Sequence, residues 1–384
     1  MGVTRKIWLR FLFLIIGIQN VIAGLNSKAK FLINTYFQDG DGGDQIYDNS
    51  KKEKVDVIEP MLFVDYKIDA DTSVNVHLVF DTWTAESDTA LDGKTGASGE
   101  GIGRQSRVGG KFGYAKDNKS WAWSGAVGFS SEYDYRSLNF SGSWEGRFAE
   151  DNFILSLSPQ LYLDQASDFN LQTEKTNEFK GRVIGAMDIS ASQLLSPNDI
   201  LSFGYTYINM NGKLNNISNS VRVLNNPYSN AYSRVEERMP NGRDRHAFST
   251  KWVHGFNDET AMHFSYRYYF DDWDVTAHTF ETGLRMTLMD DDAFIMPTYR
   301  YYSQDKSKYY VKDVPTSLTL MTSDSDLASF DAHRVGLHYE QIIGDKKISN
   351  LELLDFNFSS GAYYYKRSND LSYLTVQFGV GTQF

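Results

Sequence analysis

Cysteine is absent from all 384 residues of this sequence. Its absence excludes disulfides, thiol nucleophiles and thiolate metal ligands, so packing or backbone pairing must hold the fold together. Positive charge is also scarce, since 38 Lys and Arg stand against 49 Asp and Glu, for a formal net charge of −11. This balance argues against nucleic acid as a partner, because its phosphates call for a basic surface.

Long apolar runs are missing beyond the N-terminus. No later window reaches about 18 uncharged apolar residues, so the sequence predicts no membrane-spanning helix downstream. The N-terminus reads MGVTRKIWLRFLFLIIGIQNVIAG, in which Arg5 and Lys6 precede an apolar run that ends near the small residue Ala23. This pattern is typical of a secretory signal peptide. We expect residues 1–23 to be cleaved; a membrane anchor is the alternative, and Arg10 within the run disfavours it.

Aromatic residues, by contrast, are abundant: the sequence has 24 Tyr, 25 Phe and 7 Trp. The mean hydropathy is nevertheless −0.43, so these rings alternate with polar residues. The last fourteen residues, LSYLTVQFGVGTQF, illustrate the pattern, with apolar residues at every second position. A period of two is the signature of a β-strand with one apolar and one polar face.

About sixteen segments of this kind follow one another from Lys28, separated by clusters of Asp, Asn, Gly, Ser and Lys. An even number is typical of single-chain outer-membrane barrels. The predicted segments are 28–38, 55–67, 73–84, 105–116, 120–131, 136–148, 152–164, 181–194, 199–210, 245–256, 260–270, 274–288, 293–303, 331–342, 350–365 and 371–384.

The joins between segments fall into two alternating sets. The even joins are tight and read DADT, KDNK, AEDN, LSPND, FNDE, MDDD and IGDKK, whereas five odd joins are long: 39–54, 85–104, 165–180, 211–244 and 304–330. Short turns at one rim and long loops at the other are typical of barrels in the bacterial outer membrane. A soluble sandwich or propeller would also alternate, but Tyr, Phe and Trp near segment ends suit a membrane interface. We therefore predict that residues 24–384 form one all-β transmembrane antiparallel barrel in the outer membrane.

The final segment is predicted to be the closing strand, with its apolar face toward lipid. The apolar residues Phe378, Val380 and Phe384 at the C-terminus resemble the signal that the outer-membrane assembly machinery reads. Outer-membrane lipid and that machinery are thus expected partners. Three prolines, at positions 60, 159 and 297, conflict with closed pairing, because proline lacks a donor for the ladder. We expect bulges or shorter strands there.

Four stretches are more specific than a barrel pattern. They are NNPYS (residues 225–229), EERMPNGRDRHA (236–247), SYRYYFDDWDV (265–275) and PTYRYYSQDKSKYY (297–310). Together they resemble a family of bacterial outer-membrane proteins catalogued as domain of unknown function 3570. One departure is TGASGEG (residues 95–101), where Gly99 stands in place of the proline expected after Ala-Ser. The family has no assigned activity, and the resemblance implies a periplasmic redox or lipoprotein partner.

If the apolar faces contact lipid, charged residues of both signs face the lumen. Two interpretations are open: the charges pair with one another and stiffen the barrel, or they form a pathway or binding site for a charged solute. The lumen-facing set is Glu59, Asp65, Asp81, Lys111, Glu132, Glu145, Arg147, Asp164, Arg182, Asp188, Lys251, Arg267, Glu281, Arg285, Arg300, Arg334, Glu340 and Asp355.

Four arginines are predicted to form a positive row on one wall of the lumen. Arg267 and Arg300 occupy matching YRYY words, and Arg285 and Arg334 lie on the neighbouring segments. Arginine suits carboxylate or phosphate recognition. Glu281 and Glu340 share this wall, so neutralisation of the row is the alternative.

Other sites are weaker. The loop QDGDGGDQIYDNS contains Asp39, Asp41 and Asp44, whose oxygens suit Ca²⁺, but the spacing is not that of an EF-hand, so a solvated acidic loop is the favoured interpretation. His263, His338, Ser265 and Glu340 are candidates for a hydrolase, yet no catalytic word such as G-x-S-x-G occurs. No cofactor is predicted.

The favoured function is a channel or conduit with a charged lumen, and its constriction is expected in segment 211–244, with Arg238, Arg243 and Arg245. A scaffold that docks a periplasmic partner, and an outer-membrane hydrolase, are the alternatives.

Overall fold

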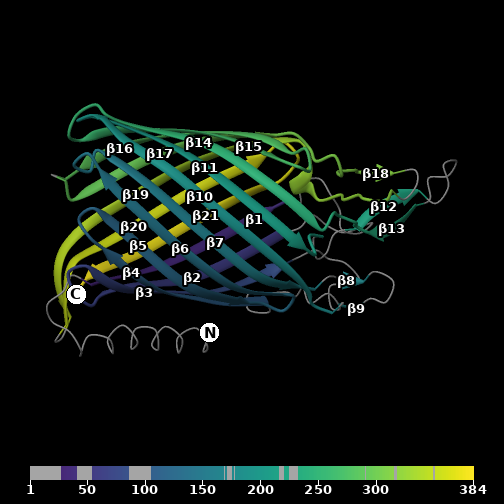
Figure 1. The fold of residues 1–384 in the computed structure, drawn as a ribbon, viewed down its shortest axis with the longest axis horizontal. Coiled ribbons are helices and arrows are strands. Elements are labelled where there is room, and N and C mark those ends of the chain that lie inside the picture. Colours follow the sequence, from purple (N-terminus) through teal and green to yellow (C-terminus); the bar gives the residue numbers. More distant parts are fainter. Residues whose placement is uncertain are drawn as a thin grey trace.

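Sixteen strands close into one antiparallel barrel (Figure 1). The computed structural model describes residues 27–40, 54–85, 105–167, 169–170, 175–176, 178–215, 220–224, 232–289, 291–314, 318–348 and 351–384. In barrel order the strands are β1 (Lys28–Asp39), β2 (Lys54–Lys67), β3 (Thr72–Ala85), β4 (Gln105–Asp117), β5 (Trp121–Ser131), β6 (Tyr135–Phe148), β7 (Phe153–Ala166), β10 (Lys180–Ser196), β11 (Asp199–Gly212), β14 (Gly242–Gly255), β15 (Thr260–Asp271), β16 (Thr276–Leu288), β17 (Ala293–Gln304), β19 (Phe330–Ile348), β20 (Leu351–Arg367) and β21 (Ser372–Gln383). Each predicted segment overlaps one of these strands, so the predicted fold is confirmed.

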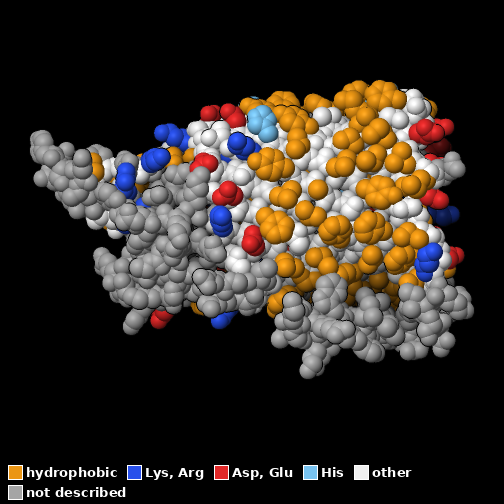
Figure 2. All heavy atoms as spheres, turned by 180° about the vertical axis from the view of Figure 1, so that it is seen from behind, with side chains coloured by type: hydrophobic (Ala, Val, Ile, Leu, Met, Phe, Trp, Pro, Cys, Tyr) orange, Lys and Arg blue, Asp and Glu red, His pale blue; other side chains and the backbone are white. Residues whose placement is uncertain are grey.

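The apolar side chains of each strand point outward. On β6, Leu138, Phe140 and Phe148 are 42%, 44% and 47% exposed. Large apolar side chains in such numbers are unfavourable in water but suit hydrocarbon. Figure 2 shows them as a band over the barrel wall, with charged side chains gathered toward the two ends of the band. Because each barrel strand pairs with two neighbours, the wall presents no unpaired edge to lipid.

The barrel closes where β1 pairs with β21. Phe31 lies opposite Val380, and Ile33 lies opposite Phe378, which is 48% exposed on the outer face. Beyond the strands, the Ser27 backbone N–H donates to the Phe384 carbonyl at 3.1 Å, and the Phe384 N–H donates back at 2.9 Å. The Phe384 ring packs against an outward-facing cluster that includes buried Leu62. The final segment is thus the closing strand, as predicted.

Short turns join the strands at the end of the barrel that holds the C-terminus (Figure 1). Between β6 and β7 the chain reverses through residues 149–151, all with positive φ. One predicted turn, at residues 343–347, is wrong: β19 continues to Ile348 through shifts in register at Gly344. Gly344 has a φ of 81°, a conformation that glycine adopts without a Cβ clash, so the strand bulges there instead of turning.

The three prolines lie inside barrel strands, contrary to the prediction of bulges or shorter strands. Next to Pro60, the pairing of β2 with β3 omits residues 59–60 but resumes in the same register. The pairing of β6 with β7 beside Pro159, and of β16 with β17 beside Pro297, is interrupted in the same way. A gap of two pairs avoids the missing proline donor without displacing the strand, so the face of every side chain is kept.

The opposite end of the barrel carries two small sheets. One pairs β8 (Phe169–Asn170) with β9 (Lys175–Thr176), and the other has the order β13 (Tyr232–Glu236), β12 (Ser220–Leu224), β18 (Asp313–Val314). These strands were not predicted, because they are two to five residues long and the three-stranded sheet pairs residues from two different joins. The sheet encloses Val221, Val223, Val314 and Met321. The long joins 211–244 and 304–330 are therefore packed together and not separate loops.

A short 3₁₀ helix, η1 (Ser325–Leu327), lies in the join before β19. Nowhere in the described ranges is a helix both long and apolar enough to cross a membrane. The predicted signal peptide at 1–23, the stretches 95–101 and 225–229, and the Ca²⁺ candidates Asp41 and Asp44 lie outside the described residues.

Candidate functional site

Two adjoining cavities lie inside the barrel. The outer cavity, of about 520 Å³, reaches from β10 and β14 to the joins at the loop end, and the inner cavity, of about 860 Å³, lies alongside it. They share five lining residues, so they adjoin each other. The shared residues are Arg267, Thr279, Tyr302, Gln304 and Asp326.

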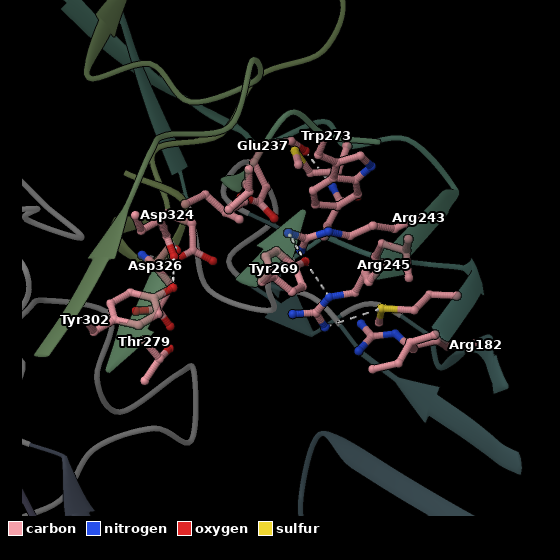
Figure 3. Close-up of a pocket in the computed structure, with 18 of the residues that line it drawn as sticks. Arg182, Glu237, Arg243, Arg245, Tyr269, Trp273, Thr279, Tyr302, Asp324 and Asp326 are labelled. Carbon is pink, nitrogen blue, oxygen red and sulfur yellow. Dashed lines mark hydrogen bonds between the residues drawn. The ribbon is translucent and has the colours of Figure 1, made fainter. Parts of the chain in front are cut away.

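Arginines line one side of the outer cavity, and acidic residues line the other. Figure 3 shows Arg182, Arg243 and Arg245 on one side, facing Asp324 and Asp326 from the join before β19. The outer cavity therefore carries side chains of opposite charge on its two sides.

Arg243 is held rigidly at the outer rim. Its Nε donates to the Asp271 carboxylate at 2.9 Å, and its guanidinium lies 4.2 Å from the centre of the Trp273 ring. The Asp271 side chain is fully buried and also accepts the backbone N–H groups of Trp273 and Val275, at 2.9 and 3.0 Å. Asp271 therefore organises the tight turn after β15, and the charge of Arg243 is neutralised.

Arg245 and Arg182 are positioned without a carboxylate. Arg245 Nε donates to the Tyr269 hydroxyl at 2.8 Å, and Arg182 Nε donates to the Lys213 carbonyl at 2.7 Å. The second contact depends on Gly212, whose φ of 114° turns the chain at the end of β11. A Cβ at Gly212 would lie 2.3 Å from the Gly181 carbonyl oxygen, so only glycine fits there.

Arg267 and Lys251 carry charge deeper into the lumen. Arg267 lines both cavities and Lys251 lines the inner one. Within the described part of the chain, neither makes an ion pair, and neither do Arg182 and Arg245. These four cations, called the arginine region below, come from β10, β14 and β15.

The predicted row of four arginines is divided by its contacts. Glu281 binds Arg300 and also accepts from Arg334 Nη2 at 3.2 Å, so one carboxylate serves two guanidiniums. The Arg285 guanidinium stacks on the Phe294 ring at 4.4 Å, while Arg267 stays unneutralised. Glutamate therefore neutralises two of the four predicted arginines, Arg300 and Arg334. Glu340 does not take part, since its carboxylate lies 3.7 Å from His338 Nε2.

Acidic residues gather on another part of the inner wall, called the acidic region below. The Arg107 guanidinium lies 2.7 Å from Asp81 and 3.5 Å from Glu59. At the loop end of this region, burial and the charges of Asp134 and Asp81 together raise the pKa of Glu132 to about 7, while Arg107 opposes them. The sequence analysis did not select Arg107, although it lies four residues before the inward-facing Lys111 on the same strand and therefore points to the same face.

The remaining candidates are dispersed. Asp188 lines the inner cavity and accepts the Thr206 hydroxyl at 2.5 Å. Asp39 is exposed at the end of β1, and among the described residues no three His, Asp or Glu side chains group as metal ligands. In the constriction segment, Arg243 and Arg245 belong to β14, which starts three residues earlier than predicted, and Arg238 pairs through its backbone with Met321.

Comparison with known proteins supports the fold. No curated protein matches the sequence. The structure is similar to a bacterial polysaccharide outer membrane secretin, with a TM-score of 0.50 and 8% identity over 94% of this chain and 100% of that one. It is also similar to Pseudomonas aeruginosa OccK1 (OpdK), with a TM-score of 0.44 and 8% identity over 93% and 98% of the chains, and to a Pseudomonas aeruginosa FadL homologue, with values of 0.41, 12%, 94% and 90%.

The closed sixteen-strand barrel and its outward apolar band place this protein in the bacterial outer membrane, as predicted. Residues 94–370 match the family described as "Protein of unknown function (DUF3570)". This match covers well over half of the sequence, and all four stretches that carried the resemblance lie within it. The chain therefore belongs to the DUF3570 family of unknown function.

Proposed function

We propose that this protein is an outer-membrane channel that conducts small hydrophilic anions along the arginine region. The two adjoining cavities supply a polar path inside the barrel. The cations of the arginine region act on a passing solute because they are not paired with carboxylates of the barrel. Arginine binds carboxylates and phosphates through paired donors, whereas lysine acts as a point charge.

One observation carries this proposal: Arg182, Arg245, Arg267 and Lys251 line adjoining cavities without an ion pair to any described residue. Charges kept only to stiffen a barrel would be expected to pair, because an unpaired charge in a low-dielectric wall is costly. These cations are instead accessible to the space that a solute would occupy. Pore-lining charges of one sign concentrate counter-ions and set selectivity.

The proposal is tested by recording single-channel currents from the refolded chain in a planar bilayer with a KCl gradient. The reversal potential is expected to show preference for Cl⁻ over K⁺. In the triple variant Arg182→Gln, Arg245→Gln, Arg267→Gln, this preference should fall by about fivefold or more, since a unit charge about 4 Å from an ion contributes about 1 kcal/mol even in water.

A matched control removes charge without changing the net charge of the lumen. Lys308→Gln combined with Asp274→Asn deletes a cation and a carboxylate that lie 3.4 Å apart and line neither cavity, so the Cl⁻ preference should stay within about twofold of the parent value. A folded barrel without conductance contradicts the proposal. So does a cation-selective parent channel, or a triple variant with unchanged selectivity.

A further inference from the structure

A connected row of aromatic rings lines the lumen next to the arginine region. The rings of Tyr365 and Tyr373 stack with their centres 4.5 Å apart, and Tyr36 follows Tyr373 at 4.8 Å. On the other side, Phe330 lies 5.6 Å from Tyr302. These five residues, called the aromatic arc, come from β1, β21, β20, β19 and β17, which are adjacent strands of the barrel.

Arg367 joins the two halves of the arc. Its guanidinium lies 4.3 Å from the centre of the Phe330 ring and 5.9 Å from that of Tyr365, and its Nε donates to the Tyr365 hydroxyl at 3.0 Å. Phe330 is buried beneath it, whereas Tyr302, Tyr365 and Tyr373 are half-buried. All three tyrosines line the inner cavity, so their rings border open space.

Hydroxyl groups and cations complete the inner cavity. Ser249, Ser265 and Thr279 line it together with Lys251 and Arg267. The hydroxyls of Ser249 and Ser265 make no hydrogen bond to another described residue. The cavity thus combines aromatic faces, hydroxyls free to bond to a ligand and cations free to attract an anion.

We infer that the inner cavity binds acidic sugars, with a pyranose ring against Tyr302, Tyr365 or Tyr373 and its carboxylate toward Arg267 and Lys251. The inference rests on the proposed function, because it names the class of anion that the channel favours. A sugar ring presents aliphatic C–H groups to the negative face of an aromatic ring, and its hydroxyls bond to serine and threonine. An aromatic acid would use the rings and cations but leave the hydroxyls of the cavity unused.

The test measures block of the channel current by glucuronate, with glucose and benzoate as comparison solutes. Glucuronate is expected to interrupt the current at a lower concentration than either, since only glucuronate engages all three kinds of group. Tyr365→Leu should raise the half-blocking concentration of glucuronate about threefold or more. Tyr365→Phe is the matched control, because it keeps the ring, and it should stay closer to the parent.

Other results overturn the inference. If glucose blocks as well as glucuronate, the cations do not contribute to binding. If benzoate blocks more strongly than glucuronate, the cavity prefers an aromatic acid to an acidic sugar. If Tyr365→Leu and Tyr365→Phe have equal effects, the sugar does not stack on the Tyr365 ring. An open channel that glucuronate does not block refutes the inference and leaves the channel function intact. Calorimetry of glucuronate with the refolded barrel in detergent measures binding independently of current. If a barrel without conductance binds glucuronate, only the proposed channel function is refuted. If the barrel does not bind glucuronate, the inference is refuted.

Discussion

The acidic region and the arginine region of the inner wall differ in whether the barrel itself supplies a counter-ion for their charges. In the acidic region, Arg107 contacts Asp81 at 2.7 Å and Glu59 at 3.5 Å, so the barrel supplies its own counter-ion. In the arginine region, Arg245 bonds to a tyrosine hydroxyl and Arg267 has no ion pair among the described residues. The first arrangement stabilises the wall, whereas the second leaves charge available to a solute.

Charge inside a barrel is therefore not by itself a sign of function. In both regions the charged residues alternate with apolar residues along their strands, and in both regions they face inward. They differ in whether the neighbouring strands place an opposite charge within reach. Substitutions in the acidic region should therefore affect stability, and substitutions in the arginine region should affect selectivity.

The largest effect on stability is expected from Arg107→Ala. It leaves Glu59 and Asp81 without their shared counter-ion, and the cost should be about 1–2 kcal/mol, below that of a fully buried pair because solvent reaches the guanidinium. Urea unfolding of the barrel in lipid measures this. Arg267→Ala is the matched control, and it should change stability by less than about 0.5 kcal/mol. Equal losses in both variants would remove the distinction between the two regions.

A smaller, pH-dependent effect is expected at Glu132. Its pKa in the folded barrel is about 7, above the ordinary value of 4.5, so the unfolded chain releases this proton first. Between these two values the unfolded state binds fewer protons, and the free energy of unfolding falls as pH rises. Glu132→Gln should weaken this fall, as measured by thermal unfolding at pH 5 and pH 8.

The control for this measurement is Glu150→Gln, which alters an exposed carboxyl in a turn at the other end of the barrel. It should keep the pH dependence of the parent. If Glu132→Gln keeps it as well, the acidic region does not strain the folded state at neutral pH.

The smallest effect is expected from Asp326→Asn. The Asp326 carboxylate is 68% exposed and lies 2.7 Å from Arg367, so the loss should be below about 1 kcal/mol. The chain around η1 should keep its place, because Gln304 donates to the carbonyls of Asp326 and Ala328, both at 2.8 Å. Hydrogen exchange of residues 325–328 measures this, and exchange as fast as in an unfolded chain would show that the ion pair holds the segment.

Much of the barrel was predictable from local pattern. The sixteen segments, the short turns and the closing strand follow from alternation and turn residues, which act over a few positions. The exceptions have local causes as well: Gly344 extends β19 through a bulge, and Pro60 is accommodated by a gap in pairing with β3. The short strands β12, β13 and β18 were missed, since five residues or fewer carry too little pattern.

The candidate site was predictable only in part. Parity assigned Arg267, Arg300 and Glu281 to the inner wall, but it does not say which charges meet. That Glu281 pairs with both Arg300 and Arg334, and that Arg267 keeps its charge, depends on the positions of these residues along four strands. The aromatic arc was hidden for the same reason, because its five rings are contributed by strands from both ends of the sequence.

Alternation and turn residues are enough to predict that the chain forms strands, which way each side chain points and which end of the barrel carries the long joins. They are enough because successive strand residues point to opposite faces, whatever the neighbouring strand. The pairing of charges, the stacking of rings and the packing of the long joins became visible only in the folded barrel. These depend on register and closure, which bring Arg107 to Glu59 and Tyr36 to Tyr373 across long stretches of chain.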